Sequence, residues 1–235
     1  MHQNASLGTL FLIPSHMGEQ ENDKLFPEYN REIIKNTSFF IVENIRTARR
    51  CIKKICKDVI IDNLTFFELD KHKPDAEIDK MIAPLLNGSN VGVLSEAGMP
   101  CIADPGNLVV EKAHEKNIKV VPLIGPSSIL LALVASGFNG QNFTFHGYLP
   151  IKEKRKQAIK SLETKGEQTQ IFMETPYRNN KFIDELIETL SPNTKLCIAC
   201  DITLDTEFIK TKKISDWKKQ KPDLNKRPTM FLIGR

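Results

Sequence analysis

Short apolar runs alternate with helix-like stretches through the first half of this 235-residue chain. The run Leu10–Ile13, which ends at Pro14, is typical of a buried strand, and SFFIV at 38–42 is another. Residues 43–57 then carry apolar side chains at helical spacing. Parallel strands joined by helices produce this alternation, so the first half predicts an α/β domain with a mostly parallel sheet. Further strands are expected at 64–69, 91–94 and 118–123, and further helices at 77–86 and 108–115.

The pattern changes after Gly125-Pro126-Ser127-Ser128, which interrupts the chain before an apolar helix expected over 129–135. From there, strand-like runs follow one another more directly. Strands are expected at 143–145, 169–173, 195–200, 207–210 and 230–233, and helices at 154–162 and 181–190. This order predicts a second α/β domain with a mixed sheet and helices. We place the boundary between domains 1–122 and 123–235.

Composition narrows the class of protein. No apolar run reaches the roughly 18 residues that a membrane-spanning helix needs. Residues 1–8 lack the basic and then apolar order of a signal peptide. The five cysteines form an odd count without regular spacing, which fits a reducing compartment better than a disulfide framework. We therefore expect a soluble cytoplasmic protein.

Charge is unevenly distributed along the chain. Residues 1–122 hold 15 Lys and Arg against 17 Asp and Glu, a net charge of −2, whereas residues 123–235 hold 18 against 12, a net charge of +6. Much of the excess falls in stretches 152–160 and 210–227. Such clusters can neutralise phosphates, although a solvated surface is the alternative. Trp217 is the single aromatic residue within 210–227, so no base-stacking surface is predicted in that stretch.

Three loops follow expected strands and carry unusual residues. Ligands of open α/β sheets bind beyond the carboxyl ends of strands, so these loops are candidate sites. The loop 95–106 combines small residues with carboxylates; the alternative is an ordered loop capped by Asp104. The turn 125–128 suits an anionic group or is simply a helix cap. The run 174–178 offers a binding corner, or an internal salt bridge between Glu174 and Arg178.

Other catalytic patterns are missing from the sequence. It contains neither a glycine-rich dinucleotide fingerprint nor a phosphate-binding P-loop. Cys197 and Cys200 form a C-x-x-C within an expected strand, where residues three apart face opposite sides and cannot share a metal. None of the five histidines has an evident partner in sequence. We predict no metal site and no Ser/His/Asp hydrolase.

Five short motifs occur in order along the chain. They are SEAGMP at 95–100, DPG at 104–106, GPSS at 125–128, GYLP at 147–150 and ETPYR at 174–178. With these motifs the chain resembles the tetrapyrrole methylase superfamily of S-adenosylmethionine-dependent methyltransferases, from Leu10 to Gly234. Within this superfamily, the chain is most similar to the bacterial enzymes that methylate the ribose 2′-hydroxyl of a cytidine in 16S ribosomal RNA.

Four segments depart from the pattern of that family. The first loop, usually PTPIGN, reads PSHMGE at 14–19, and the usual EDTR is ENIR at 43–46. Glu96 replaces the aspartate of the long loop, and 200–204 replaces an RELTK-like stretch. The cofactor half therefore follows the family more closely than the expected substrate half.

The resemblance implies a two-domain α/β fold with S-adenosylmethionine in a cleft between the domains, and a homodimer. Its cofactor-binding positions correspond here to Pro14, Glu96, Ala97, Gly98, Met99, Ile102, Ser127, Ser128, Met173, Glu174, Cys200 and Thr229.

Methyl transfer to a ribose hydroxyl would proceed by direct displacement, and a general base would help the hydroxyl to react. Glu43 and Glu174 are the candidate bases, and Arg46 and Arg178 are candidate partners for phosphate or carboxylate. For Glu43 the alternative is a first-turn glutamate that the helix dipole favours. The function predicted is methylation of ribosomal RNA. The alternatives are a methyltransferase acting on a tetrapyrrole or other small molecule, and a non-catalytic RNA-binding protein that keeps the cofactor pocket.

Overall fold

The computed structural model describes residues 6–19, 21, 24–69, 77–165 and 167–234. Contacts divide the chain into two units, Met1–Pro126 and Ser127–Arg235. The boundary expected from sequence, after residue 122, falls at the end of the last strand of the first unit.

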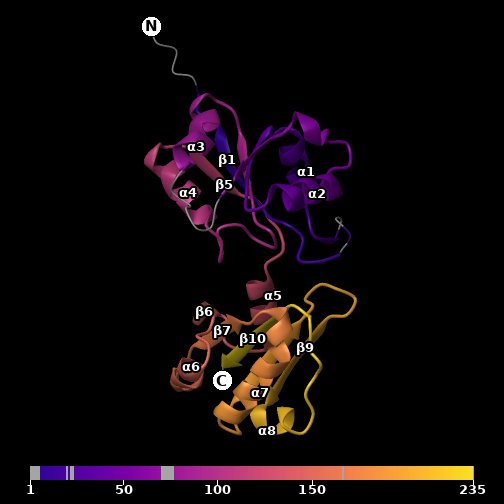
Figure 1. The fold of residues 1–235 in the computed structure, drawn as a ribbon, viewed down its shortest axis with the longest axis vertical. Helices are drawn as coiled ribbons and strands as arrows, with labels where there is room; N and C mark the ends of the chain where they lie inside the picture. Colours follow the sequence, from indigo (N-terminus) through magenta and orange to yellow (C-terminus); the bar gives the residue numbers. More distant parts are fainter. Residues whose placement is uncertain (1–5, 20, 22–23, 70–76, 166, 235) are drawn as a thin grey trace. The chain divides into compact units, whose positions relative to one another are not determined.

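The first unit contains a parallel five-stranded sheet (Figure 1). Its strands pair in the order β3-β2-β4-β1-β5, and every pair is parallel. This confirms the parallel sheet that the sequence predicts. The strands are β1 (Thr9–Ile13), β2 (Phe39–Val42), β3 (Thr65–Glu68), β4 (Val91–Leu94) and β5 (Lys119–Pro122).

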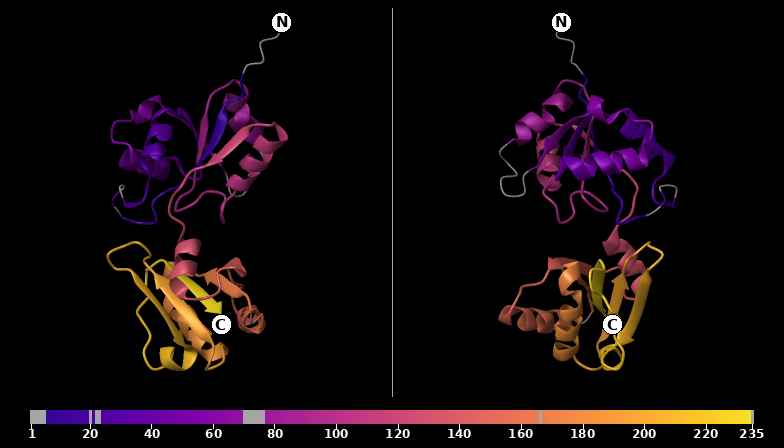
Figure 2. Two further views of the ribbon diagram at one scale, coloured as in Figure 1. Left: turned by 180° about the vertical axis from the view of Figure 1, so that it is seen from behind. Right: turned by 45° about the vertical axis from the view of Figure 1, so that its right-hand side comes forward.

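Helices cover both faces of this sheet, as Figure 2 shows. Because side chains alternate along a strand, Phe11 and Phe40 point to one face while Leu10 and Ile41 point to the other. One face packs against α1 (Glu28–Lys35) and α2 (Ile45–Ile55), and the other against α3 (Ile78–Leu86) and α4 (Gly106–Glu115). A short 3-10 helix spans Ile61–Asn63.

Helix α1 was not expected from the sequence. It has few apolar residues, and it buries Asn30, whose side-chain amide donates to the backbone oxygen of Ile124 at 2.8 Å. That contact joins residues 94 positions apart, so no local pattern indicates it.

The second unit contains a mixed five-stranded sheet in the order β6-β7-β10-β8-β9. Only the β6/β7 pair is parallel, so the expectation of a mixed sheet is confirmed. Strand β9 continues three residues beyond the predicted end at 210, because its lysines pair with β8 at the sheet edge. The strands are β6 (Phe143–Tyr148), β7 (Thr169–Met173), β8 (Lys195–Cys200), β9 (Phe208–Lys213) and β10 (Thr229–Gly234).

Two sets of helices flank this second sheet. Helix α5 (Ser128–Ser136) packs on one face, where the Thr211 hydroxyl donates to the backbone oxygen of Ser136 at 2.7 Å. The opposite face holds an aromatic core in which Phe182 meets Phe172 and Phe231 edge-on, and Trp217 is buried. The elements on that side are α6 (Glu153–Thr164), the 3-10 turn η3 (Pro176–Arg178), α7 (Asn179–Thr189) and α8 (Ile214–Trp217). No helix formed by the described residues is long and apolar enough to cross a membrane.

Candidate functional site

The loops after β1 and β4 leave neighbouring strands toward opposite faces of the first sheet. Strand β1 leads to α1 on one face, and β4 leads to α4 on the other. Such a reversal of strand order opens a crevice at the carboxyl ends of the strands, which is where ligands bind in open α/β sheets. The motif-bearing loop 95–106 follows β4 and therefore starts at this point.

Ser15 ties these two loops together. Its backbone N–H donates to the oxygen of Gly98 at 2.8 Å, and the N–H of Gly98 donates back at 3.2 Å. The Ser15 hydroxyl also donates to the backbone oxygen of Ser95 at 2.7 Å, and Ser15 is almost fully buried. The first loop departs from the family sequence at this serine, and the serine fixes the loop to the SEAGMP motif.

Asp104 holds the second half of the long loop. Its Oδ1 accepts from the backbone N–H groups of Cys101 at 3.0 Å and Gly106 at 2.8 Å, whereas its Oδ2 is buried without a hydrogen-bond partner among the described residues. Gly98, Cys101 and Ala103 all have positive φ, which is a strained conformation for the latter two. Asp104 therefore caps the loop, as the alternative interpretation of the sequence predicts.

Burial sets the protonation of the side chains in this loop. Burial raises the pKa of Asp104, and the nearby Glu43 adds to this rise, while the backbone hydrogen bonds from Gly106 and Cys101 oppose it. Burial, and then the charge of Asp104, raises the pKa of Cys101 to about 12. The thiol of Cys101 therefore stays protonated at neutral pH and is not a nucleophile.

Glu43 reaches the long loop from the end of β2. Its Oε1 accepts from the backbone N–H of Glu96 at 3.3 Å. Asn44 is the N-cap of α2, and its side chain accepts from Thr47 N at 3.1 Å. Glu43 thus lies before the cap, so the alternative that places it in the first helical turn is wrong. Arg46 is exposed on that turn and makes no ion pair with another described residue.

The turn after β5 packs tightly on Pro14. A Cβ added to Gly125 would lie 2.2 Å from Cγ of Pro14, which is closer than real Cβ contacts allow. Ser127 then caps α5, because its hydroxyl accepts from Leu130 N at 3.4 Å. Ser127 is buried and Ser128 is half-buried. The GPSS motif therefore forms a helix cap, as one interpretation of the sequence predicts. Cofactor binding at this turn stays a prediction.

Three of the predicted residues of the second unit, Met173, Cys200 and Thr229, lie at one end of its sheet. Thr229 pairs with Cys200 across β10 and β8, and Met230 pairs with Met173 across β10 and β7. Cys200 faces the aromatic core and is fully buried, so its thiol is not exposed to a ligand. Burial raises the pKa of its thiol although the Thr229 hydroxyl opposes the rise. The structure brings these three positions together, and their contact with a cofactor stays a prediction.

Glu174 is buried, 5% exposed, between two arginines. Its Oε2 accepts from Nη2 of Arg155 at 2.5 Å, and its Oε1 accepts from Nε and Nη2 of Arg178 at 3.0 and 2.6 Å. Oε1 also accepts from the N–H of Thr175 at 2.7 Å. Burial by itself raises the pKa of this carboxyl, but these hydrogen bonds and the two positive charges lower it overall. Glu174 is thus an ion-pair anchor and a poor proton acceptor, and the internal salt bridge with Arg178 is confirmed.

Arg155 was expected only as part of the basic stretch 152–160, and it is instead buried. Besides Glu174, its guanidinium donates to the Pro150 backbone oxygen at 2.7 Å and to Glu185 at 3.0 Å. It also lies 5.0 Å from the centre of the Phe182 ring. The sequence does not indicate this role, because the neighbouring lysines are typical of a solvated face.

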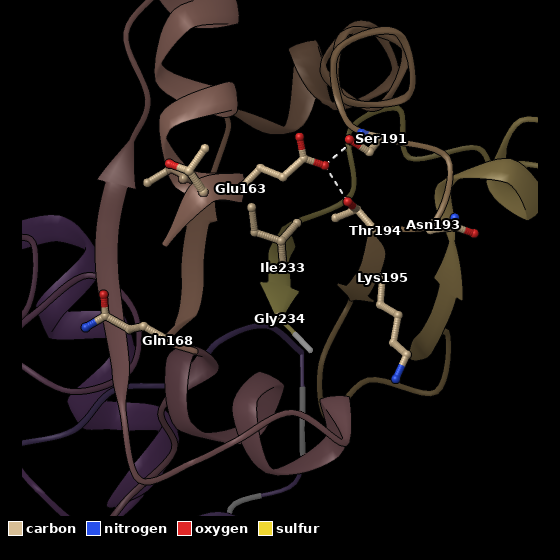
Figure 3. Close-up of a pocket in the computed structure, with 10 residues that line it drawn as sticks. Glu163, Gln168, Ser191, Asn193, Thr194, Lys195, Ile233 and Gly234 are labelled. Atoms are coloured by element: carbon tan, nitrogen blue, oxygen red, sulfur yellow. Dashed lines mark hydrogen bonds between the residues drawn. The ribbon is translucent and has the colours of Figure 1, made fainter. Parts of the chain in front are cut away.

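A pocket of about 530 Å³ opens at the opposite end of the second sheet (Figure 3). There Oε1 of Glu163 accepts from the Ser191 N–H at 2.7 Å and from the Thr194 hydroxyl, which closes a turn before β8. No predicted site residue lines this pocket. This pocket therefore lies away from the residues that the motifs predict for the cofactor.

The described residues contain no group of three or more His, Cys, Asp and Glu side chains placed to hold a metal. Cys197 and Cys200 lie on opposite faces of β8, since Cys200 is in the aromatic core and Cys197 is beside the Thr211 hydroxyl. The histidine His146 contacts Gln170, with Nε2 and Oε1 2.6 Å apart.

We expect Gly125→Ala to weaken binding of S-adenosylmethionine about tenfold or more, because the new methyl group must displace Pro14 and the loops tied to it. Calorimetric titration measures the dissociation constant. Gly140→Ala is the matched control, since no atom lies within 4 Å of the Cβ it would add. Equal affinities for the two variants would remove the first-unit crevice from the cofactor site.

We expect Glu174→Gln to lower the free energy of unfolding at pH 7 by about 3 kcal/mol, because it breaks a buried ion pair. The lowered pKa means that the stabilisation is complete above the unfolded value of about 4.3 and is lost as the pH falls through the lower folded value. The difference between parent and variant should therefore shrink below pH 4. Urea unfolding followed by Trp217 fluorescence tests this. Arg178→Gln, at the half-exposed partner, should cost less than Glu174→Gln at pH 7.

Comparison with known proteins places the chain in a family. Residues 28–217 match the family model of the tetrapyrrole (corrin/porphyrin) methylases. Ribosomal RNA small subunit methyltransferase I of Buchnera aphidicola subsp. Schizaphis graminum is 32% identical over 231 residues, which cover 96% of this chain and 78% of the relative. The protein of the same name from Escherichia coli O157:H7 is 26% identical, covering 99% of this chain and 80% of the relative.

Solved structures share the fold at lower identity. The methyltransferase CobJ superposes with a TM-score of 0.62 at 17% identity, covering 97% of this chain and 94% of that one. Uroporphyrin-III-C-methyltransferase from Thermus thermophilus superposes with a TM-score of 0.54 at 15% identity, covering 97% and 92%. With the family match spanning most of both units, the chain belongs to the tetrapyrrole methylases, enzymes that take their methyl group from S-adenosylmethionine.

Proposed function

We propose that this methyltransferase transfers the methyl group of S-adenosylmethionine to a ribose 2′-hydroxyl of small-subunit ribosomal RNA. The observation that carries the proposal is the similarity to ribosomal RNA small subunit methyltransferase I, which extends through both units. The two superposed structures, CobJ and the uroporphyrin enzyme, are only 17% and 15% identical, and a shared fold does not fix the acceptor. RNA is therefore favoured over a tetrapyrrole.

The loop residues at the carboxyl ends of the strands in the first unit are suited to binding the cofactor. Ala97 and Gly98 are small, and the positive φ of Gly98 is one that a glycine adopts without strain. A ligand could therefore approach the backbone of this loop closely. We propose that Pro14, Glu96, Ala97, Gly98, Met99 and Ile102 hold the cofactor from the first unit, and that Ser127, Ser128, Met173, Glu174, Cys200 and Thr229 contribute from the second.

S-adenosylmethionine supplies a methyl group that is already electrophilic, so the protein must mainly position the acceptor. The hydroxyl oxygen forms a bond to the methyl carbon as the carbon–sulfur bond breaks, and the hydroxyl proton leaves to a base or to water. Correct placement of the oxygen, at about 3 to 3.5 Å, accounts for much of the rate. Of the two candidate bases, Glu43 is the better, because both oxygens of Glu174 already accept hydrogen bonds from arginines.

The basic stretch 210–227 supports RNA as the acceptor, because some of its lysines are exposed and have no ion pair with another described residue. Lys212 lies over the Trp217 ring at 4.8 Å, and Lys219 pairs with Asp216 at 3.0 Å. Lys213 and Lys218, by contrast, are exposed and have no ion pair with another described residue. Unpaired lysines on a surface are free to neutralise RNA phosphates.

Location and assembly complete the proposal. The ribosomal RNA acceptor of the relatives supports a cytoplasmic enzyme. The resemblance to the superfamily supports a homodimer.

We expect the purified protein to transfer tritiated methyl groups from S-adenosylmethionine to small ribosomal subunits from cells that lack it. A 2′-O-methyl group blocks alkaline cleavage of its own phosphodiester, so the label should appear in an alkali-resistant dinucleotide. Gly125→Ala serves as the control with a damaged cofactor crevice. Label in a uroporphyrinogen but in no RNA fraction would assign the enzyme to tetrapyrroles, and transfer to neither acceptor would favour the non-catalytic alternative.

We expect the double variant Lys213→Gln/Lys218→Gln to bind RNA more weakly and with a flatter salt dependence. Each lost phosphate contact should reduce the slope of log K against log salt by about 0.7 on single strands. The pair Lys212→Gln/Lys219→Gln is the matched control, because these lysines already contact Trp217 and Asp216. Identical slopes for parent and both variants would make the stretch a solvated face.

A further inference from the structure

An exposed aromatic and cationic surface lies where β6 and β7 end in the second unit. We call it the Tyr148–Arg178 surface, and it consists of Tyr148, Ile151, Lys152, Tyr177 and Arg178. The residues Tyr148 and Tyr177 are 58% and 77% exposed, and the Arg178 side chain is 52% exposed. Single exposed apolar residues are common, but a contiguous exposed patch with polar neighbours is typical of an interaction site.

The backbone of β6 directs Tyr148 outward. The register with β7 shifts between Phe145 and Tyr148, so that Tyr148 pairs with Met173. Gly147 lies within this irregularity and has a φ of +62°, a conformation that favours glycine. Bulges of this kind re-aim a side chain and are common beside binding sites. Tyr148 is therefore placed by a specific feature of the strand.

Tyr177 and Arg178 are held by the turn that follows β7. Both lie in the 3-10 turn Pro176–Arg178, and the buried Glu174 fixes the guanidinium of Arg178 through two of its nitrogens. The phenol of Tyr148 is near enough to Arg178 to interact with it electrostatically. The two tyrosines, 29 positions apart in sequence, thus belong to one local surface.

Arg155 joins the two segments that carry the surface. It donates to the Pro150 backbone oxygen, after β6, and to Glu174, after β7. Between them, Lys152 has a φ of +60° and a ψ of −142°, a strained conformation for a residue with a side chain. Lys152 is exposed and has no ion pair with another described residue. The contacts of Arg155 thus hold together the two backbone segments that carry the surface, which lowers the entropy cost of binding.

We propose that the Tyr148–Arg178 surface binds single-stranded RNA, with nucleobases stacked on Tyr148, Tyr177 and the guanidinium plane of Arg178, and with Lys152 against a phosphate. The proposal rests on the proposed function and names how its RNA substrate is held. Exposed aromatic rings beside cations are what single-stranded RNA requires, because every base offers a face for stacking. Tyr148 also pairs with Met173, so a nucleotide bound here would lie beside the predicted cofactor positions of this sheet.

The test is binding of a fluorescein-labelled 12-nucleotide oligocytidylate, measured by fluorescence anisotropy. Tyr148→Leu and Tyr177→Leu should each weaken binding between about fivefold and 150-fold, the range for loss of one stacked base. The salt slope should stay unchanged, since no phosphate contact is lost. Tyr177→Phe should bind like the parent because it keeps the ring. Tyr29→Leu is the matched control, at the exposed tyrosine of α1 in the other unit.

Methyl transfer to small ribosomal subunits, measured on the same variants, separates this inference from the proposed function. Supporting results are a raised KM for RNA in Tyr148→Leu and Tyr177→Leu with an unchanged dissociation constant for S-adenosylmethionine. If the parent methylates RNA and both leucine variants bind and methylate like it, the surface is not an RNA site although the function stands. If the parent methylates no RNA, the proposed function fails, and anisotropy alone decides whether the surface binds RNA.

Discussion

The buried ion pair between Arg155 and Glu174 is the contact on which one end of the second unit depends. Each residue has further partners, Pro150 and Glu185 for Arg155 and Arg178 for Glu174, so the pair joins the segments after β6 and β7 to helix α7. Desolvating two charges is costly, and hydrogen bonds to the remaining polar atoms offset that cost. The ETPYR motif can be understood in this way: its glutamate anchors a turn whose tyrosine and arginine stay exposed.

The first unit obtains its site by a different route, from topology. All five strands are parallel, so the loops after β1, β2, β4 and β5 emerge at the same edge. Short contacts then lock these loops together: Ser15 to Gly98, Glu43 to Glu96, and Gly125 against Pro14. The Ser15–Gly98 contact is made by backbone atoms, and Pro14 and Glu43 keep the family's residues, so the altered side chains of the first loop and of ENIR are compatible with these contacts. This weakens the main argument for a protein that has lost its activity.

The sequence predicted those parts of the structure that local patterns determine. Strand and helix alternation gave the parallel and mixed sheets, and short motifs gave the loops at the strand ends. It failed where a distant partner decides the outcome. Helix α1 depends on a hydrogen bond from Asn30 to Ile124, Arg155 is buried despite its basic neighbours, and the lysines of β9 extend an edge strand. Tyr148 and Tyr177 of the Tyr148–Arg178 surface likewise come onto one surface only in the folded sheet.

The contacts of Glu174 also constrain which of the two units can supply a general base. A carboxylate whose pKa is lowered and whose oxygens accept from two arginines holds its charge but takes up protons poorly. If the enzyme uses a carboxylate base, that base must come from elsewhere, and Glu43 on the first unit is the candidate that remains. The second unit would then supply RNA recognition, through stacking rings and unpaired lysines, and part of the cofactor site, while the first unit supplies the rest of the cofactor site and the proton acceptor. In such an arrangement a change at Tyr177 alters affinity for RNA, whereas a change at Glu43 alters the rate of the chemical step.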